Sequence, residues 1–217
     1  MKTKVILADD HKILREGLKT LLMQQNDVEV VGEAGDGFET IRLCNALQPD
    51  LVIMDIGMPS LNGIEACKRI LSENPKIKVL ALSMHSDKQF VINMFKAGAS
   101  GYLLKDCAAD ELKVAIQTIL GNNFFLSQHI SKIVIMELIN SRDVSQNKDI
   151  PQLSGREKEV LQMIAEGMST KEIGKKLFIS PKTVESHRKN IMQKLELYTL
   201  PELTKYAIRA GITFLEK

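Results

Sequence analysis

The amino-acid sequence predicts two domains of different class: a doubly wound parallel α/β sheet and, after it, a small all-α domain. Three observations lead to this prediction. Short apolar runs alternate with helical periods over about the first 120 residues, this alternation stops near residue 125, and only helical periods follow residue 150. A length of 217 residues suits two small domains. We expect the first domain at 1–124, a helical connector and linker at 125–149, and the second domain at 150–217.

The first domain is expected to contain five strand–helix units. Each apolar run is continuous, as in parallel strands that are buried on both faces. Prolines and glycines, such as Pro49, Pro75 and Gly98, stop the helices that follow. This alternation predicts a five-stranded parallel sheet with right-handed crossovers. The expected strands are 5–8, 28–34, 51–54, 77–82 and 101–104, and the expected helices are 10–25, 38–47, 62–72, 87–96 and 108–120.

The rest of the chain is expected to be helical. A helix is predicted over 128–140, and the following segment 141–149 has little to bury, so we interpret it as the linker. Ser180 and Pro181 are a typical N-cap and first helical residue. The second domain is therefore predicted to have four short helices, at 154–166, 170–178, 182–195 and 201–210.

Charge and cysteine content narrow the function classes. Residues 1–149 carry 17 Lys and Arg against 19 Asp and Glu, and residues 150–217 carry 12 against 8, so the net charge changes from −2 to +4. The second domain is therefore the candidate for meeting a polyanion, although ordinary scatter explains such a difference about equally well. Three cysteines without a CxxC pair argue against a disulfide framework and a zinc site. With no signal peptide and no membrane span, the sequence predicts a cytoplasmic protein.

Polar residues follow the predicted strands at the edge where α/β sheets bind ligands. Asp9 and Asp10 follow the first strand, Asp55 the third, Ser83 the fourth and Lys105 the fifth. If the first and third strands are neighbours, three carboxylates converge, and Mg²⁺ (or Mn²⁺) with its preference for oxygen ligands resolves their repulsion. A carboxylate nucleophile, a metal ion and a lysine together suit phosphoryl transfer. The alternative is a set of solvated acids of the kind that often end strands.

Four segments of the first domain, ILADDH, VIMDIGMPSLNG, ALSMHS and GYLLKD, resemble the signatures of receiver domains of two-component response regulators over about residues 3–122. The resemblance implies a flavodoxin-like fold with strand order 2-1-3-4-5. It also implies that Asp55 is the phosphoacceptor and that Asp9, Asp10, Asp55 and the backbone carbonyl of Gly57 hold Mg²⁺. Ser83 would then bond a phosphoryl oxygen, Lys105 would form the phosphate ion pair, and Tyr102 would be the rotameric switch partner.

One position departs from the family pattern. Many receiver domains have a cis proline after the lysine, whereas here Asp106 follows Lys105. A cis bond before a residue other than proline costs about 3 kcal/mol, so the geometry of this bond stays open. Gly57 and His85 lie where the family tunes dephosphorylation, and His85 is more often a solvated loop residue than a catalytic one.

The second domain contains a short helix, a tight turn and a second helix with a basic outer face, an arrangement that suits the DNA major groove. An ordinary solvated helix face is the alternative. Residues 150–215 closely resemble the LuxR-type helix-turn-helix domain of NarL/FixJ response regulators. The resemblance implies that 182–195 is the recognition helix, with Glu185, Ser186 and Lys189 nearest base edges and Lys182, Thr183 and Arg188 nearer phosphates.

Two features of this domain stay open. Glu157 is either a structural acid paired with a recognition-helix residue or an acid favoured in the first helical turn. The helix at 201–210 either makes the dimer contact on DNA, as the resemblance implies, or packs locally.

The two resemblances together imply a DNA-binding transcriptional response regulator. A sensor histidine kinase would phosphorylate Asp55, and the phosphorylated homodimer would bind double-stranded promoter DNA. The protein would not be an enzyme in the usual sense, although it would catalyse its own slow dephosphorylation.

Other readings fit the sequence less well. A haloacid dehalogenase-type phosphatase needs an acid where Gly57 stands. A flavodoxin-like nucleotide binder needs a Gly- or hydroxyl-rich loop where Asp9, Asp10 and His11 stand. A quorum-sensing LuxR receptor would have an aromatic-rich first domain, but aromatics are 5% of the chain and Trp is absent. The intact acidic set argues against a regulator that no longer uses phosphate.

Overall fold

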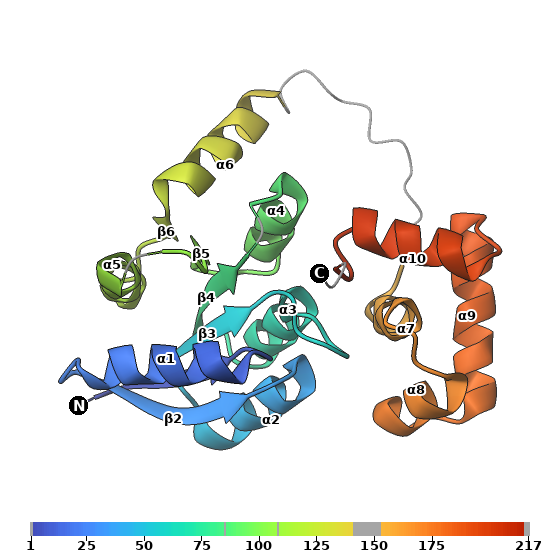
Figure 1. The fold of residues 1–217 in the computed structure, drawn as a ribbon, viewed down its shortest axis with the longest axis horizontal. Coiled ribbons are helices and arrows are strands. Elements are labelled where there is room, and N and C mark those ends of the chain that lie inside the picture. The colour runs from blue at the N-terminus through green and yellow to red at the C-terminus, as the bar shows by residue number, and fades with distance from the viewer. Residues whose placement is uncertain (1, 85, 108, 141–152, 215–217) are drawn as a thin grey trace. The chain divides into compact units, whose positions relative to one another are not determined.

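The computed structural model describes residues 2–84, 86–107, 109–140 and 153–214 (Figure 1). The chain divides into two compact units, one within residues 1–144 and one within 145–217. The predicted linker at 141–149, the predicted start of the second domain at 150, and His85 lie outside the described residues, so the domain boundaries remain a prediction.

The first unit is built on a parallel sheet with the order β2-β1-β3-β4-β5-β6. The first five strands have the predicted order. The prediction of five strands is corrected by β6, which pairs with β5 through Gly101↔Phe125 and Tyr102↔Leu126. A strand of two residues is too short to produce a detectable period. The strands are β1 (Thr3–Ala8), β2 (Val28–Ala34), β3 (Leu51–Asp55), β4 (Lys78–Ser83), β5 (Gly101–Leu104) and β6 (Phe125–Leu126).

Helices cover both faces of this sheet. On one face, Leu22 of α1 (Lys12–Met23) and Ile116 of α5 (Ala109–Leu120) share a buried cluster with strand side chains such as Val5 and Ile53. On the other face, Ile6 lies near the side chains of Leu43 and Leu47 in α2. Next to α2 (Gly37–Leu47) pack α3 (Gly63–Glu73) and then α4 (Lys88–Lys96). The helix α6 (Gln128–Asn140) has its predicted bounds and contacts α4 and β6.

In its described residues, 153–214, the second unit contains helices and no strand, as predicted. Ser154, Ser169 and Thr199 cap three of its helices and form capping boxes, and Ser180 caps the remaining one with Pro181 in its first turn. The helices are α7 (Gly155–Ala165), α8 (Thr170–Leu177), α9 (Pro181–Leu195) and α10 (Leu200–Arg209), and their shared core includes Val160, Ile173, Val184, Ile191 and Leu203. Among the helices of the described residues, none has both the length and the hydropathy that crossing a bilayer requires.

Candidate functional site

The strand register brings the predicted acidic residues to one edge of the sheet. Ala8 pairs with Met54, so Asp9 and Asp55 follow neighbouring positions of β1 and β3. Ser83 pairs with Leu104, so Lys105 directly follows the partner of Ser83 on the adjacent strand. Four polar side chains from four strand ends therefore lie together, because parallel strands end at the same edge.

A buried ammonium group joins two buried carboxylates at this edge. Lys105 Nζ lies 2.7 Å from Asp9 Oδ2 and 2.9 Å from Asp55 Oδ2. The three side chains are 4%, 3% and 6% exposed. The other oxygen of Asp55, Oδ1, accepts a hydrogen bond from the Gly57 N–H at 3.1 Å. Two carboxylates facing one ammonium leave an excess of negative charge that burial makes unfavourable.

The pKa shifts follow from this charge balance. Burial raises the pKa of Asp55, and the neighbouring Asp9 adds to the rise while Lys105 and the Gly57 N–H oppose it. Burial alone would lower the pKa of Lys105, but the two carboxylates outweigh burial and raise it. Lys105 therefore stays charged at neutral pH, and any further positive charge at the site would stabilise the two ionised carboxylates.

The residues at the rim fit a divalent cation. Asp9, Asp10, His11 and Asp55 each offer a ligand atom, and these atoms lie within 4.8 Å of one another. Carboxylate oxygens are the ligands that Mg²⁺ prefers in proteins. The Asp10 side chain is 34% exposed, so it faces solvent from which an ion can enter. His11 Nδ1 lies 2.9 Å from Asp10 Oδ1. The only feature of the sequence that points to this contact is the position of His11 directly after Asp9 and Asp10.

The start of α3 packs closely against the end of β3. Asn62 caps α3 by accepting a hydrogen bond from the Glu65 N–H at 2.9 Å. The Gly63 N–H donates to the Ile56 carbonyl at 3.0 Å. A Cβ on Gly63 would collide with the Asp55 carbonyl oxygen, so only glycine allows this approach beside Asp55.

The predicted switch residues are in contact. Ser83 is 1% exposed and Tyr102 is fully buried. Burial raises the pKa of Tyr102 to about 12, against the opposing effect of a hydrogen bond with Ser83. No peptide bond within the described ranges is cis, and this includes the bond between Lys105 and Asp106.

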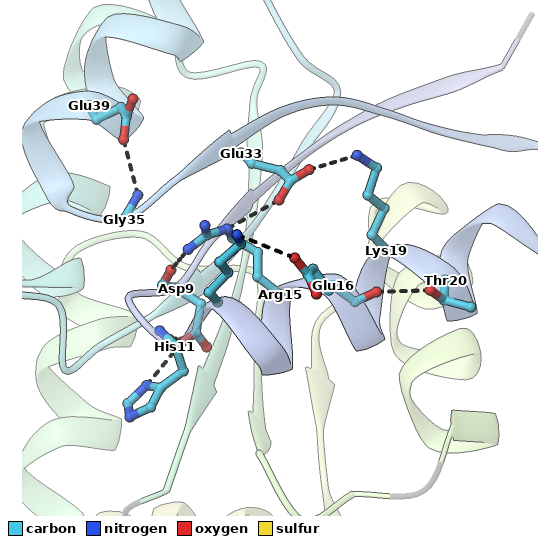
Figure 2. A network of polar contacts seen from close by, with 10 residues as sticks. Asp9, His11, Arg15, Glu16, Lys19, Thr20, Glu33, Gly35 and Glu39 are labelled. Atoms are coloured by element: carbon cyan, nitrogen blue, oxygen red, sulfur yellow. Dashed lines mark hydrogen bonds and ion pairs between the residues drawn. The ribbon is translucent and has the colours of Figure 1, made fainter.

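A network on α1 and β2 holds the backbone of the acidic loop (Figure 2). Arg15 donates from Nη1 to the Asp9 carbonyl and from Nε to Glu33 Oε2, the latter at 3.2 Å. Lys19 Nζ donates to Glu33 Oε1 at 2.7 Å and lowers the pKa of Glu33. The Arg15 side chain is only 16% exposed. Arg15 thus fixes the carbonyl of Asp9 while Lys105 fixes its side chain.

In the second unit, α8 and α9 are joined by a tight turn. The Ile179 N–H donates to the Gly174 carbonyl at 3.0 Å, and a Cβ on Gly174 would lie 2.8 Å from the Ile179 carbonyl oxygen. Glycine at this position therefore allows the turn to close against α8. On α9, Val184 and Ile191 are buried. Of the six predicted contact residues, Arg188 is partly buried, and the exposed ones are Lys182, Thr183, Glu185, Ser186 and Lys189.

Two family models match the chain. Residues 5–117 match the response regulator receiver domain, and residues 151–207 match the bacterial regulatory proteins of the luxR family. The chain is a response regulator of the NarL/FixJ family. The first unit of this two-component response regulator contains its receiver domain, and the second contains a LuxR-type DNA-binding domain.

Relatives match the response regulator over nearly its whole length. The transcriptional regulatory protein YhcZ of Bacillus subtilis, whose own role is uncharacterized, is 40% identical over 209 residues, covering 96% of this chain and 97% of the relative. The oxygen regulatory protein NreC of Staphylococcus haemolyticus is 38% identical over 210 residues, with 95% and 97% covered. A structure of RcsB from Salmonella enterica serovar Typhimurium, bound to a promoter with a phosphomimetic, is 30% identical and has a TM-score of 0.61, with 98% and 100% covered.

Glu157 of the DNA-binding domain has both of the roles that the sequence left open. Its side chain completes the capping box with Ser154 at the start of α7. Its Oε2 also accepts a hydrogen bond from Lys194 Nζ of α9 at 2.8 Å. Burial would raise the pKa of Glu157, but Lys194 and Ser154 outweigh burial and lower it. Glu157 therefore connects the start of α7 to the end of α9.

Glu157→Gln is expected to destabilise the DNA-binding domain by about 0.5–1 kcal/mol at pH 7, because Gln keeps the capping box and loses only the ion pair. A carboxyl group with a lowered pKa stabilises the folded state above its ordinary pKa, and this contribution is lost as the pH falls through the lower value. The difference between wild type and variant should therefore vanish in acid. Urea unfolding, with hydrogen exchange resolved to α7 and α9, measures both effects. Glu196→Gln, at the exposed end of α9, is the control, and an equal loss in both variants contradicts the ion-pair explanation.

Proposed function

We propose that this response regulator is a transcription factor controlled by phosphorylation of Asp55. A sensor histidine kinase transfers a phosphoryl group to a carboxylate oxygen of Asp55, and the phosphorylated protein dimerises and binds double-stranded promoter DNA. The observation that carries the proposal is the Lys105 ammonium lying 2.7 Å from Asp9 and 2.9 Å from Asp55 in a buried site. Since promoter DNA is its target, we expect the protein in the cytoplasm.

Each residue of the site has a role in this proposal. Asp55 is the nucleophile, because its Oδ1 already accepts the Gly57 N–H and its ionised form is held by Lys105. Lys105 pairs with the negative charge of the incoming phosphoryl oxygens. Asp9, Asp10, Asp55 and the backbone carbonyl of Gly57 would hold Mg²⁺ or Mn²⁺, which neutralises charge on the phosphoryl oxygens when bound.

Phosphorylation would be read through Ser83 and Tyr102. The Ser83 hydroxyl at the end of β4 would bond a phosphoryl oxygen, and Tyr102 shares a hydrogen bond with Ser83. Movement of Ser83 toward the phosphoryl group would change the packing of Tyr102, a local change that biases a two-state element. The face built from α4, β5 and α5 would respond. We also propose that the protein slowly hydrolyses its own phosphoryl group.

Dimerisation is expected because one recognition helix is short. One recognition helix contacts too few bases for selectivity, so two copies are expected on half-sites about 10 bp apart. The RcsB structure that is bound to a promoter with a phosphomimetic supports the link between phosphorylation and promoter binding.

The test of the proposal is phosphoryl uptake from acetyl phosphate, followed by intact mass and peptide mapping. With Mg²⁺ the protein should gain one phosphoryl group on Asp55, and excess chelator should prevent this. Asp10→Asn should require more Mg²⁺ for half-labelling, because one ligand charge is lost. Asp106→Asn, an exposed acid next to the site, is the control and should behave as wild type. Labelling of another residue, or full labelling in chelator, would contradict the proposal.

A further inference from the structure

The recognition helix α9 carries a single acidic residue, Glu185. It lies on the exposed face with Lys182, Ser186 and Lys189, since positions three, four and seven residues apart share one side of a helix. DNA phosphates attract the two lysines and repel the carboxylate. An acid at the centre of such a face lowers the affinity for DNA in general, unless it meets a hydrogen-bond donor there.

Thr170, the first residue of α8, holds this carboxylate in place. Its Oγ1 donates a hydrogen bond to Glu185 Oε1 at 2.7 Å. Thr170 is partly buried, and a β-branched side chain has few accessible rotamers. A glutamate fixed in this way loses less conformational entropy when it docks than a mobile one does. The hydrogen bond occupies Oε1, and among the described residues no hydrogen bond or ion pair involves Oε2.

The neighbouring hydroxyl on this face is occupied differently. Ser186 Oγ donates to the Lys182 carbonyl at 3.0 Å, so its proton is used within α9. The face therefore presents a fixed acceptor, Glu185 Oε2, between two exposed lysines, Lys182 and Lys189. Glu185 Oε2 therefore requires a hydrogen-bond donor on the DNA, while the lysines on either side of it can bind acceptors or phosphates.

The major groove offers such a donor at cytosine and adenine only. Cytosine presents its N4 amino group, and glutamate is a typical acceptor for it. Adenine presents its N6 amino group beside N7, an acceptor that repels a carboxylate, while guanine and thymine present acceptors. We propose that Glu185, positioned by Thr170, selects a cytosine in each half-site of the DNA. This inference rests on the proposed function and specifies what the recognition helix reads.

The experiment is selection of binding sites from a pool of random duplexes by the full-length protein with beryllofluoride and Mg²⁺. The wild type should enrich a cytosine at one position of each half-site. Glu185→Gln should change that preference to adenine, because Gln pairs with adenine N6 and N7. Competition titrations should then show that the preference for cytosine over adenine falls by roughly 5- to 150-fold, the range for one good base contact.

Thr170 is tested as a positioning residue. Thr170→Val keeps the shape and removes the donor, so the cytosine preference should weaken while the salt dependence of binding stays unchanged. Thr170→Ser restores a hydroxyl and should restore the preference, and Glu196→Gln, which removes the same charge at the far end of α9, should keep it. Thermal unfolding of each variant separates folding from readout.

The possible results are distinguishable. If Glu185→Gln enriches the same base as wild type at every position, the inference is overturned and the Thr170–Glu185 hydrogen bond only joins two helices. If Thr170→Ser fails to restore the preference although it folds, the positioning role of Thr170 is overturned. If the wild type enriches no sequence at all, the proposed function itself fails and this inference falls with it.

Discussion

Asp55→Asn is expected to make the receiver domain more stable while abolishing phosphoryl uptake. Without a divalent cation, two buried carboxylates face one ammonium, and the pKa of Asp55 is raised by its burial. Asparagine removes one of these charges and leaves Lys105 paired with Asp9. We expect the free energy of unfolding to rise by roughly 1–2 kcal/mol at pH 7, within the range of single stabilising substitutions. Urea unfolding in chelator measures it.

The pH dependence has a defined sign. When folding raises the pKa of a carboxyl group, the free energy of unfolding falls as the pH rises from the ordinary pKa through the raised one. Wild type and Asp55→Asn should therefore be closest in acid and diverge toward neutral pH. Mg²⁺ should stabilise the wild type, by about 2.7 kcal/mol at a concentration one hundred times the dissociation constant, and the variant less. Asp106→Asn is the control, and a variant less stable than wild type at pH 7 would contradict this charge balance.

The parts of the fold that the sequence predicts are those with a long, regular signal. Five strands are predicted from continuous apolar runs such as 51–54 and from the glycines and prolines that end the helices between them. The residues that follow these strands converge because parallel strands end at the same edge of the sheet. The strand β6 was missed, because Phe125–Leu126 is too short to carry a period. Its pairing with β5 depends on an edge that exists only once the sheet has formed.

The missed contacts of the two sites have a common cause. Arg15 looks like a surface residue of an amphipathic helix, yet its partners are the Asp9 carbonyl and Glu33 of β2. The Thr170–Glu185 hydrogen bond likewise joins residues on two helices. Each contact depends on how two elements are packed, which no local pattern in the sequence records. Residues after strand ends are the exception, since topology alone brings them together.

Lys189→Ala is expected to weaken DNA binding by about 1–3 kcal/mol if Lys189 makes a bidentate base contact. Lys189 is exposed on α9, one turn beyond Glu185. A lysine ammonium group can donate hydrogen bonds to guanine O6 and N7 or to phosphates. A base contact predicts a loss concentrated at one position of the selected site. A phosphate contact predicts a similar loss for all sequences and a salt slope smaller by about one.

Footprinting and salt titration of the full-length protein with beryllofluoride separate these two results. Lys68→Ala, which removes the same charge from the exposed side of α3 in the receiver domain, is the control and should leave DNA binding unchanged. If Lys189→Ala binds the selected site as wild type does at every salt concentration, α9 does not face the DNA through Lys189. The basic face of the helix would then be a solvated surface, and the protection seen in footprinting would have to come from another element.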